Sequence, residues 1–124
     1  MRVTTFIADG DNVRADVVKE PSWQPLSEYD GQPLEGVQLV EVEKLRLGEI
    51  QLVEISVGGR FAMHTSPDVA FCQIVRGKGK LGLPGGTEIS YESPELYVFH
   101  PGSLHDWHDI EEDTLLSVCL VRAG

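Results

Sequence analysis

The 124-residue sequence has little positive charge, few cysteines and no long hydrophobic run. Ten Lys and Arg residues stand against twenty Asp and Glu residues, and the formal net charge is −10. Because this charge opposes contact with nucleic-acid phosphates and anionic lipid, we expect neither as a partner. Cys72 and Cys119 are too few for a disulfide framework, so we expect free thiols. The longest apolar runs fall far short of the roughly 20 residues of a membrane-spanning helix.

The N-terminus also lacks the pattern of a secretory signal, because it reaches Asp9 before any long apolar stretch. A cytoplasmic location is therefore expected. Residues 1–36 are rich in Asp, Gly, Pro and Ser, which predicts an irregular arm with one short strand near Val13–Lys19. Residues 37–124 then form a single domain, in keeping with the usual size of one hydrophobic core.

From Val37 onward the sequence consists of short β-rich runs separated by turn residues, and no helical hydrophobic stripe is present. We expect turns at Gly58-Gly59 and at Gly77-Lys78-Gly79, among others. This pattern predicts an all-β fold, a barrel of jelly-roll type with six to eight strands and the N-terminal arm. The strands expected are Val37–Leu47, Glu49–Val57, Ala70–Arg76, Gly79–Leu83, Glu88–Tyr91, Leu96–His100, Leu104–His108 and Leu115–Val121.

Two segments carry histidines at regular intervals. The first runs Gly58, five residues, His64-Thr65-Ser66, three residues, Ala70, six residues, Gly77. The second runs Pro94, five residues, His100-Pro101-Gly102, two residues, His105, three residues, Asp109. Every interval resembles those of the two motifs of the cupin superfamily, in which the first motif contains H-x-H and a Glu and the second a third His. The resemblance implies a double-stranded β-helix, that is, a cupin jelly-roll barrel.

The resemblance also implies a metal site with His64 and His105 as ligands. Ser66 stands where the family has its second His, and Ala70 stands where it has its Glu. Two imidazoles alone hold a divalent ion weakly, since catalytic sites usually supply about three protein ligands. The cofactor expected is therefore either one weakly held transition metal (Zn, Fe, Ni, Cu or Mn) or none.

Further residues are candidates for the barrel cavity. Strand alternation places Cys72 on the same face as Ala70, whereas Gln73 requires a local bulge to reach the cavity. Tyr97 and Trp107 are candidates to stack on a ligand, although large aromatic residues are also common in a core. The same alternation turns Trp107 inward and His108 outward. The candidate pocket residues are Ser66, Ala70, Cys72, Gln73, Tyr97 and Trp107.

These residues are compatible with two main functions. One is a metal-assisted enzyme of dioxygenase, isomerase or lyase type that acts on a small polar metabolite. The other is a metal-free, non-catalytic module, either a ligand-binding protein or a scaffold, in which the loss of a His and a Glu enlarges the cavity. In both cases we expect a small-molecule ligand, and a homodimer in which the arm packs on a neighbour.

Overall fold

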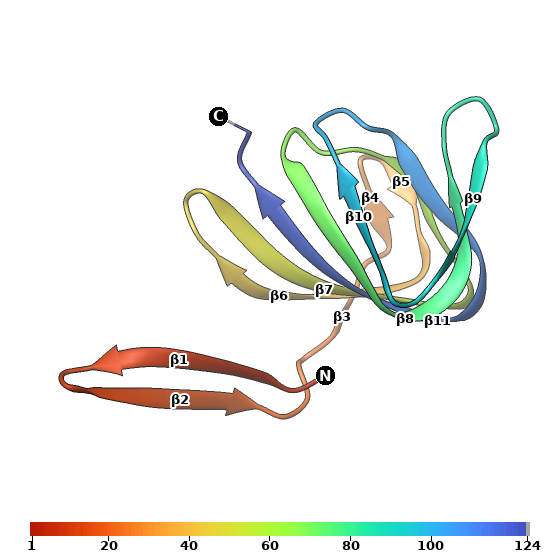
Figure 1. The fold of residues 1–124 in the computed structure, drawn as a ribbon. Helices are drawn as coiled ribbons and strands as arrows, with labels where there is room; N and C mark the ends of the chain where they lie inside the picture. Colours follow the sequence, from red (N-terminus) through yellow and green to blue (C-terminus); the bar gives the residue numbers. More distant parts are fainter. Residues whose placement is uncertain (124) are drawn as a thin grey trace.

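Eleven β-strands and no helix make up residues 1–123, the part of the chain that this computed structural model describes (Figure 1). The all-β class predicted from the sequence is confirmed. No helix among these residues is long and apolar enough to cross a membrane. The strands are β1 Val3–Asp9, β2 Asn12–Val18, β3 Gln24–Pro25, β4 Glu28–Tyr29, β5 Gln32–Pro33, β6 Glu35–Lys44, β7 Gly48–His64, β8 Val69–Gly82, β9 Glu88–Glu92, β10 Glu95–Phe99 and β11 His105–Val121.

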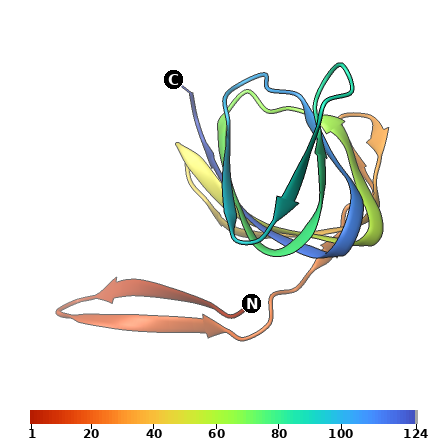
Figure 2. The same ribbon diagram turned by 45° about the vertical axis from the view of Figure 1, so that its right-hand side comes forward.

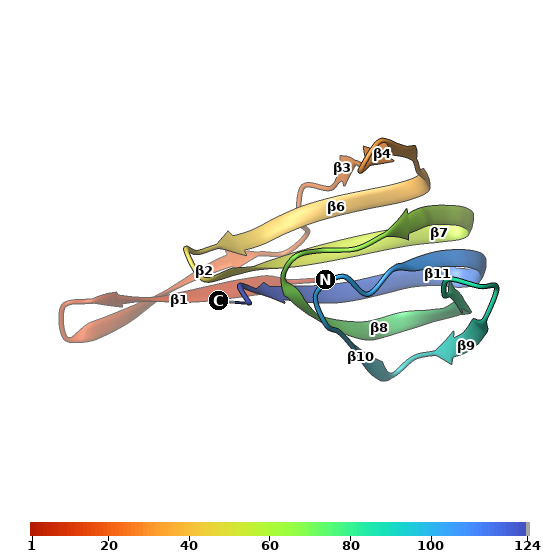
Figure 3. The same cartoon turned by 90° about the horizontal axis from the view of Figure 1, so that it is seen from above.

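The main sheet has seven antiparallel strands. Its order is β10-β8-β11-β7-β6-β3, and β9 pairs with β8. Strands β6, β7, β11 and β8 lie side by side when seen from above (Figure 3). The sheet curls on itself into a barrel (Figure 2), which brings strand faces far apart in the sequence toward one interior.

The N-terminal arm is more regular than the sequence predicts. Instead of one short strand it forms the antiparallel hairpin β1–β2, which extends away from the barrel (Figure 1). Gly10 has φ +62° at the first central position of its two-residue turn, as type II′ hairpin turns require. After the hairpin, β3 pairs with β6, so part of the segment expected as an arm belongs to the main sheet.

Two of the expected turns are bends inside long strands. Strand β7 continues for 17 residues through Gly58 and Gly59, and β8 for 14 residues through Gly77 and Gly79. Register shifts between β8 and β11 accompany these bends, because extra residues let a strand change direction without ending. At the bend, the Val57 side chain is exposed to solvent.

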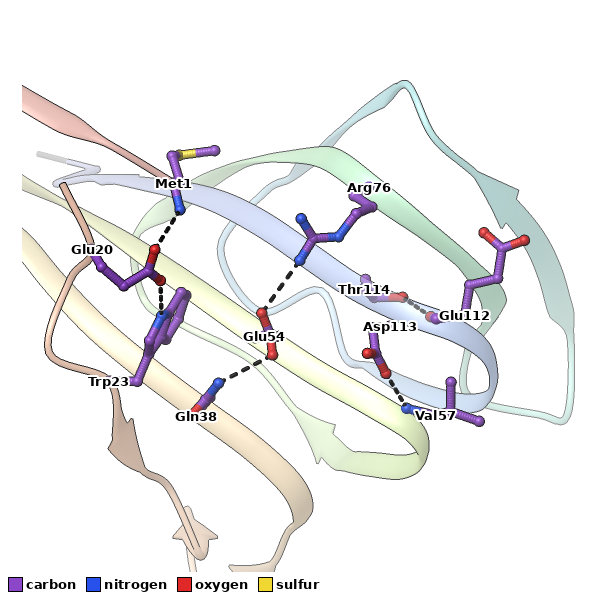
Figure 4. A network of polar contacts seen from close by, with 10 residues as sticks. All are labelled: Met1, Glu20, Trp23, Gln38, Glu54, Val57, Arg76, Glu112, Asp113 and Thr114. Atoms are coloured by element: carbon purple, nitrogen blue, oxygen red, sulfur yellow. Dashed lines mark hydrogen bonds and ion pairs between the residues drawn. The ribbon is translucent and has the colours of Figure 1, made fainter.

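Buried side chains from the main sheet form one core, and a polar network ties its strands together on the outside. Ile55, Ile74 and Tyr91 have almost no exposed surface. On the outer face, the Glu54 carboxylate accepts hydrogen bonds from Gln38 and Arg76, which links β6, β7 and β8 (Figure 4). The barrel is therefore held by apolar packing inside and by cross-strand polar contacts outside.

Candidate functional site

A cavity of about 290 Å³ opens at one end of the barrel between β7, β8, β10 and β11. Its lining is mainly apolar and aromatic, with His64 and His105 among the polar groups. Pockets of this size and composition are typical of sites for small organic molecules. The cavity is therefore the candidate functional site.

The two histidines meet because their strands pair directly. His64, the last residue of β7, is the register partner of His105, the first residue of β11. Their ring centroids are 4.4 Å apart, with 60° between the ring planes. One step further along, Trp107 pairs with Phe61, so β7 contains one residue more than β11 between the two pairs. This bulge turns both Phe61 and His64 toward the cavity, which strict alternation would not allow.

Both imidazoles are oriented in the same way by the backbone. The Nδ1–H of His64 donates to the carbonyl oxygen of Ala62 (2.8 Å), and the Nδ1–H of His105 donates to that of Ser103 (2.9 Å). These bonds place the ring lone pair on Nε2. Neither Nε2 atom has a hydrogen-bond partner among the described residues. Every fully buried side-chain nitrogen or oxygen of these residues does have one, so the two Nε2 atoms are not fully buried. Each Nε2 is therefore accessible, and it offers the cavity a hydrogen-bond acceptor.

Burial keeps both histidines neutral. It lowers the pKa of His64, and it lowers the pKa of His105 to about 4, with the neighbouring His64 contributing in the same direction. In this position, the loss of hydration destabilises a protonated imidazole by more than its hydrogen bond to the backbone carbonyl stabilises it. At neutral pH the site therefore presents two uncharged imidazoles.

The depressed pKa of His105 predicts a specific loss of stability in acid. Between pH 6.5, the ordinary value for His, and about 4 the unfolded chain binds more protons than the folded one. The stabilisation is complete above this window and is lost as the pH falls through it. The free energy of unfolding of wild type is expected to fall on going from about pH 7 to about pH 4.5. In His105→Gln, whose side chain cannot be protonated, we expect this fall to be smaller by about 2–3 kcal/mol.

Urea denaturation of both proteins at the two pH values measures this difference. Groups away from the pair, including His108, are common to wild type and variant and cancel in the comparison, so the difference reports on His105 together with its effect on the neighbouring His64. Parallel loss of stability in the two proteins would contradict the assigned pKa of His105.

An aromatic shell surrounds the two histidines. Phe99 stacks on His105 with ring centroids 3.8 Å apart and 10° between the planes, and Phe61 lies 4.1 Å from His64. Tyr29 contacts His64 edge-on at 5.4 Å. These three aromatic residues were not predicted as site residues. Phe61 lies inside the first motif and Phe99 inside the second, but only the bulge and the paired strands show that their rings face the cavity.

Four of the six predicted pocket residues line the cavity: Ser66, Ala70, Cys72 and Trp107. The Ser66 hydroxyl accepts a hydrogen bond from the Asp68 N–H (3.0 Å), so it also shapes the loop at the rim. Burial raises the pKa of the Cys72 thiol to about 12. Cys72 therefore lines the cavity as a protonated, apolar side chain and not as a thiolate ligand.

The other two predicted pocket residues do not line the cavity. Gln73 is exposed on the outer face, because its neighbours Cys72 and Ile74 are buried and β8 has no bulge at this point. Tyr97 stacks behind Trp107, with centroids 6.3 Å apart, and its hydroxyl donates to Glu95. Tyr97 thus supports the cavity wall from behind, and a direct ligand contact is not expected.

The donor set falls short of a catalytic metal site. In residues 1–123, no three His, Cys, Asp or Glu ligand atoms lie within 4.8 Å of one another around His64 and His105. Asp68 is at the cavity rim, but its carboxylate accepts a hydrogen bond from Arg122 at 3.0 Å. At the cavity, therefore, the described residues bring together two neutral imidazoles, whereas catalytic metal sites usually have three protein ligands.

A second cluster lies outside the cavity. Glu88, His108 and Asp109 place ligand-type atoms within 4.8 Å of one another. However, both ring nitrogens of His108 donate to carboxylates, Nδ1 to Asp106 (2.5 Å) and Nε2 to Glu88 (2.9 Å). Burial lowers the pKa of His108, but these hydrogen bonds outweigh it and the net shift is upward. The arrangement is that of an imidazolium in an ion-pair network.

No protein-family model matches the sequence, and no curated protein matches it either. Solved structures match its fold at low identity. A cupin 2 conserved barrel domain protein from Rhodopseudomonas palustris has a TM-score of 0.69 at 20% identity, covering 98% of this chain and 81% of that one. The cupin domain of Cnp3 from Schizosaccharomyces pombe has a TM-score of 0.71 at 11% identity, covering 98% and 87%.

The polyketide cyclase RemF from Streptomyces resistomycificus is a third match, with a TM-score of 0.65 at 14% identity over 71% of this chain and 66% of that one. At these identities the likeness concerns the fold and not the activity. The strand pairing, the paired histidines and the barrel cavity all agree with it. The chain therefore has the fold of cupin domains, the double-stranded β-helix barrel that its two motifs predict.

Proposed function

We propose that the barrel binds a small, uncharged aromatic molecule with hydroxyl groups, and that it does so without a metal ion. The observation that carries this proposal is the pairing of two neutral imidazoles inside an aromatic shell. The rings of Phe61, Phe99 and Trp107 offer surfaces for stacking. The accessible Nε2 atoms of His64 and His105 accept hydrogen bonds from ligand hydroxyl groups.

The charges around the cavity favour a ligand without negative charge. Glu49 and Asp68 line the cavity, but no Lys or Arg of the described residues does. A carboxylate or phosphate ligand would lose its hydration and meet only neutral or negative groups. This distinguishes the site from pockets built for acidic metabolites, which use Arg or Lys.

The similarity to a polyketide cyclase supports an organic ligand of this kind. RemF, as its name states, acts on a polyketide, and it has the same fold around its barrel. That activity is not transferred to this chain. It supports only the proposal that a barrel of this fold accommodates an organic ligand.

Tryptophan fluorescence tests the proposal directly. The chain has two tryptophans, and in a Trp23→Phe background the signal reports on Trp107 in the cavity wall. We expect saturable quenching by catechol, and binding at least about 10-fold weaker for benzoate, which has the same ring and a negative charge. Equal affinity for benzoate, or no saturable signal with either compound, would contradict the proposed ligand class.

Matched variants locate the binding. His64→Leu and His105→Leu each replace an imidazole, and with it one Nε2 hydrogen-bond acceptor, by an apolar side chain. We therefore expect about 10-fold weaker catechol binding in each variant. His108→Leu removes an imidazole from the outer network and is expected to leave binding unchanged. If all three variants bind catechol like wild type, the ligand does not contact the histidine pair.

Metal-assisted catalysis of dioxygenase, isomerase or lyase type is the second candidate function. It is favoured by the Nδ1–H bonds to backbone carbonyls, since metal-ligating histidines are commonly oriented in this way. His64 and His105 would hold the ion, which would supply Lewis-acid chemistry, and water would complete its coordination. The same titration after treatment with a chelator separates the candidates. Catechol binding that survives chelation supports the metal-free site, and binding that requires an added ion supports the second candidate.

A further inference from the structure

The β1–β2 hairpin has an uncharged face that its own chain leaves uncovered. In an antiparallel pair, directly opposed residues lie on the same face and alternate along the strands. One face therefore carries Phe6, Val13 and Val17 together with small side chains, and Phe6 is 70% and Val13 68% exposed. Arg14 and Asp16, which form an ion pair, lie on the opposite face. This opposite face also carries Val3, Ile7 and Val18, so it is of mixed character, whereas the first face is apolar, uncharged and exposed to solvent.

This hairpin needs a covering partner. The extensive contacts of β1 and β2 are with each other, and the pair extends beyond the barrel in all three ribbon views (Figures 1, 2 and 3). At its base, Glu20 contacts the N-terminal amine and the Trp23 indole (Figure 4), but these contacts leave the apolar face free. An isolated two-stranded hairpin is at best marginally stable in water. Packing of its apolar face on another surface would supply the missing stabilisation.

The barrel carries a matching surface on its outside. Val98, Phe71, Cys119 and Ile50 are successive register partners across β10, β8, β11 and β7, and they form one uncharged row on the outer face. We call this row the outer band. Val98, Phe71 and Ile50 are exposed, and Leu96 beside them is 63% exposed. In a chain with a net charge of −10, an exposed apolar row that crosses four strands indicates an interaction surface.

Charge also favours contact between the hairpin of one copy and the barrel of another. Residues 1–20 contain three Lys or Arg and four Asp or Glu, and residues 21–124 contain seven and sixteen. The side chains of the hairpin segment therefore contribute a net −1, and those of the barrel segment −9. Two barrel segments repel each other strongly, whereas the hairpin segment, with a net charge of only −1, approaches the outer band with a much smaller penalty.

From these observations we infer that two copies of the chain form a dimer in which each hairpin lays its apolar face on the outer band of the other. The contact is reciprocal, so a two-fold axis closes the assembly and no apolar face is left to recruit further copies. A hairpin with seven residues per strand presents a face roughly 23 Å long and about 10 Å wide. Two hairpins and two bands then bury on the order of 900 Å², close to the ~1,000 Å² at which specific interfaces begin.

Analytical ultracentrifugation of the full chain tests the dimer. We expect wild type to be dimeric, and Phe6→Lys or Phe71→Glu to raise the dimer dissociation constant at least about 100-fold, because each substitution acts at two symmetric contacts. Thr5→Lys adds the same charge to the opposite face of the hairpin and is expected to leave the dimer intact. The double variant Phe6→Lys, Phe71→Glu places opposite charges in contact across the interface, and we expect it to regain dimerisation.

Three outcomes would overturn the inference. One is a wild-type monomer at about 100 µM, a concentration at which a specific contact of this size is populated. In that case the hairpin would bind a different protein or a membrane. Another is a dimer that resists both single substitutions. The third is a double variant no better than the single variants. Because Phe6 and Phe71 are both exposed, thermal unfolding followed by circular dichroism is expected to show unchanged folding of the barrel.

Discussion

Ser66→His combined with Ala70→Glu is expected to create a metal site that binds one divalent transition-metal ion per chain, with affinity on the order of 1,000-fold above wild type. The two substitutions restore the residue types that the cupin motifs have at these intervals. Ser66 and Ala70 line the same cavity as His64 and His105. The variant would thus offer three imidazoles and a carboxylate, a set that suits Zn, Fe, Ni or Mn.

Isothermal titration with Zn and Ni, together with elemental analysis, measures this gain. The titration is run in a His108→Leu background, which removes the outer cluster as a competing site. Ser66→His with Ala70→Gln is the matched control, since the amide has the size of Glu without its charge and is expected to bind at least about 10-fold more weakly. An affinity equal to wild type, or metal uptake that survives His64→Ala and His105→Ala, would show that the cavity does not bring these positions together around an ion.

Gly77→Ala is expected to destabilise the fold by more than about 3 kcal/mol. Gly77 has φ +119°, and a Cβ there would lie 2.6 Å from Thr114 Cα and 2.9 Å from the Asp113 carbonyl oxygen. These are backbone atoms of the paired strand β11, and the buried Thr114 side chain is held by a 2.6 Å hydrogen bond to Tyr91. The clash therefore cannot be relieved by turning a flexible side chain.

Gly85→Ala separates the backbone strain from the clash. Gly85 also has positive φ, +87°, but nothing lies within 4 Å of the Cβ position. Its substitution is expected to cost about 1–2 kcal/mol, the usual penalty for this backbone region. Urea denaturation of both variants measures the difference. Similar losses in the two variants would mean that β11 moves aside and that the close packing at Gly77 contributes little.

The fold and the histidine pair were accessible from the sequence because they depend on spacing. The intervals between Gly58 and Gly77 and around His105 set where strands bend and which side chains converge, and both histidines do meet in the barrel. Inward alternation likewise placed Cys72 and Trp107 at the cavity. Such features follow from local periodicity, which survives the exchange of individual residues.

Features that depend on closure of the sheet were not accessible. Glycines mark a bend as well as a turn, so the sequence at Gly77 did not distinguish one long strand from two short ones. Tyr29 reaches His64 from a segment expected to be an arm, and no local pattern signals that contact. The hairpin strand Val3–Asp9 was missed for another reason, since its sequence, Val-Thr-Thr-Phe-Ile-Ala-Asp, lacks the alternation of apolar and polar residues that indicates a half-buried strand, and most of the strand is exposed.

The bulge between Phe61 and His64 has a consequence for how this site tolerates change. Side chains here can be exchanged one at a time, because the backbone pairing with His105 and Trp107 does not depend on them. The removal or insertion of one residue, in contrast, would reverse the facing of Phe61 relative to His64 and turn one of them to solvent. Viable relatives are therefore expected to differ in this segment by substitution, while its length is preserved.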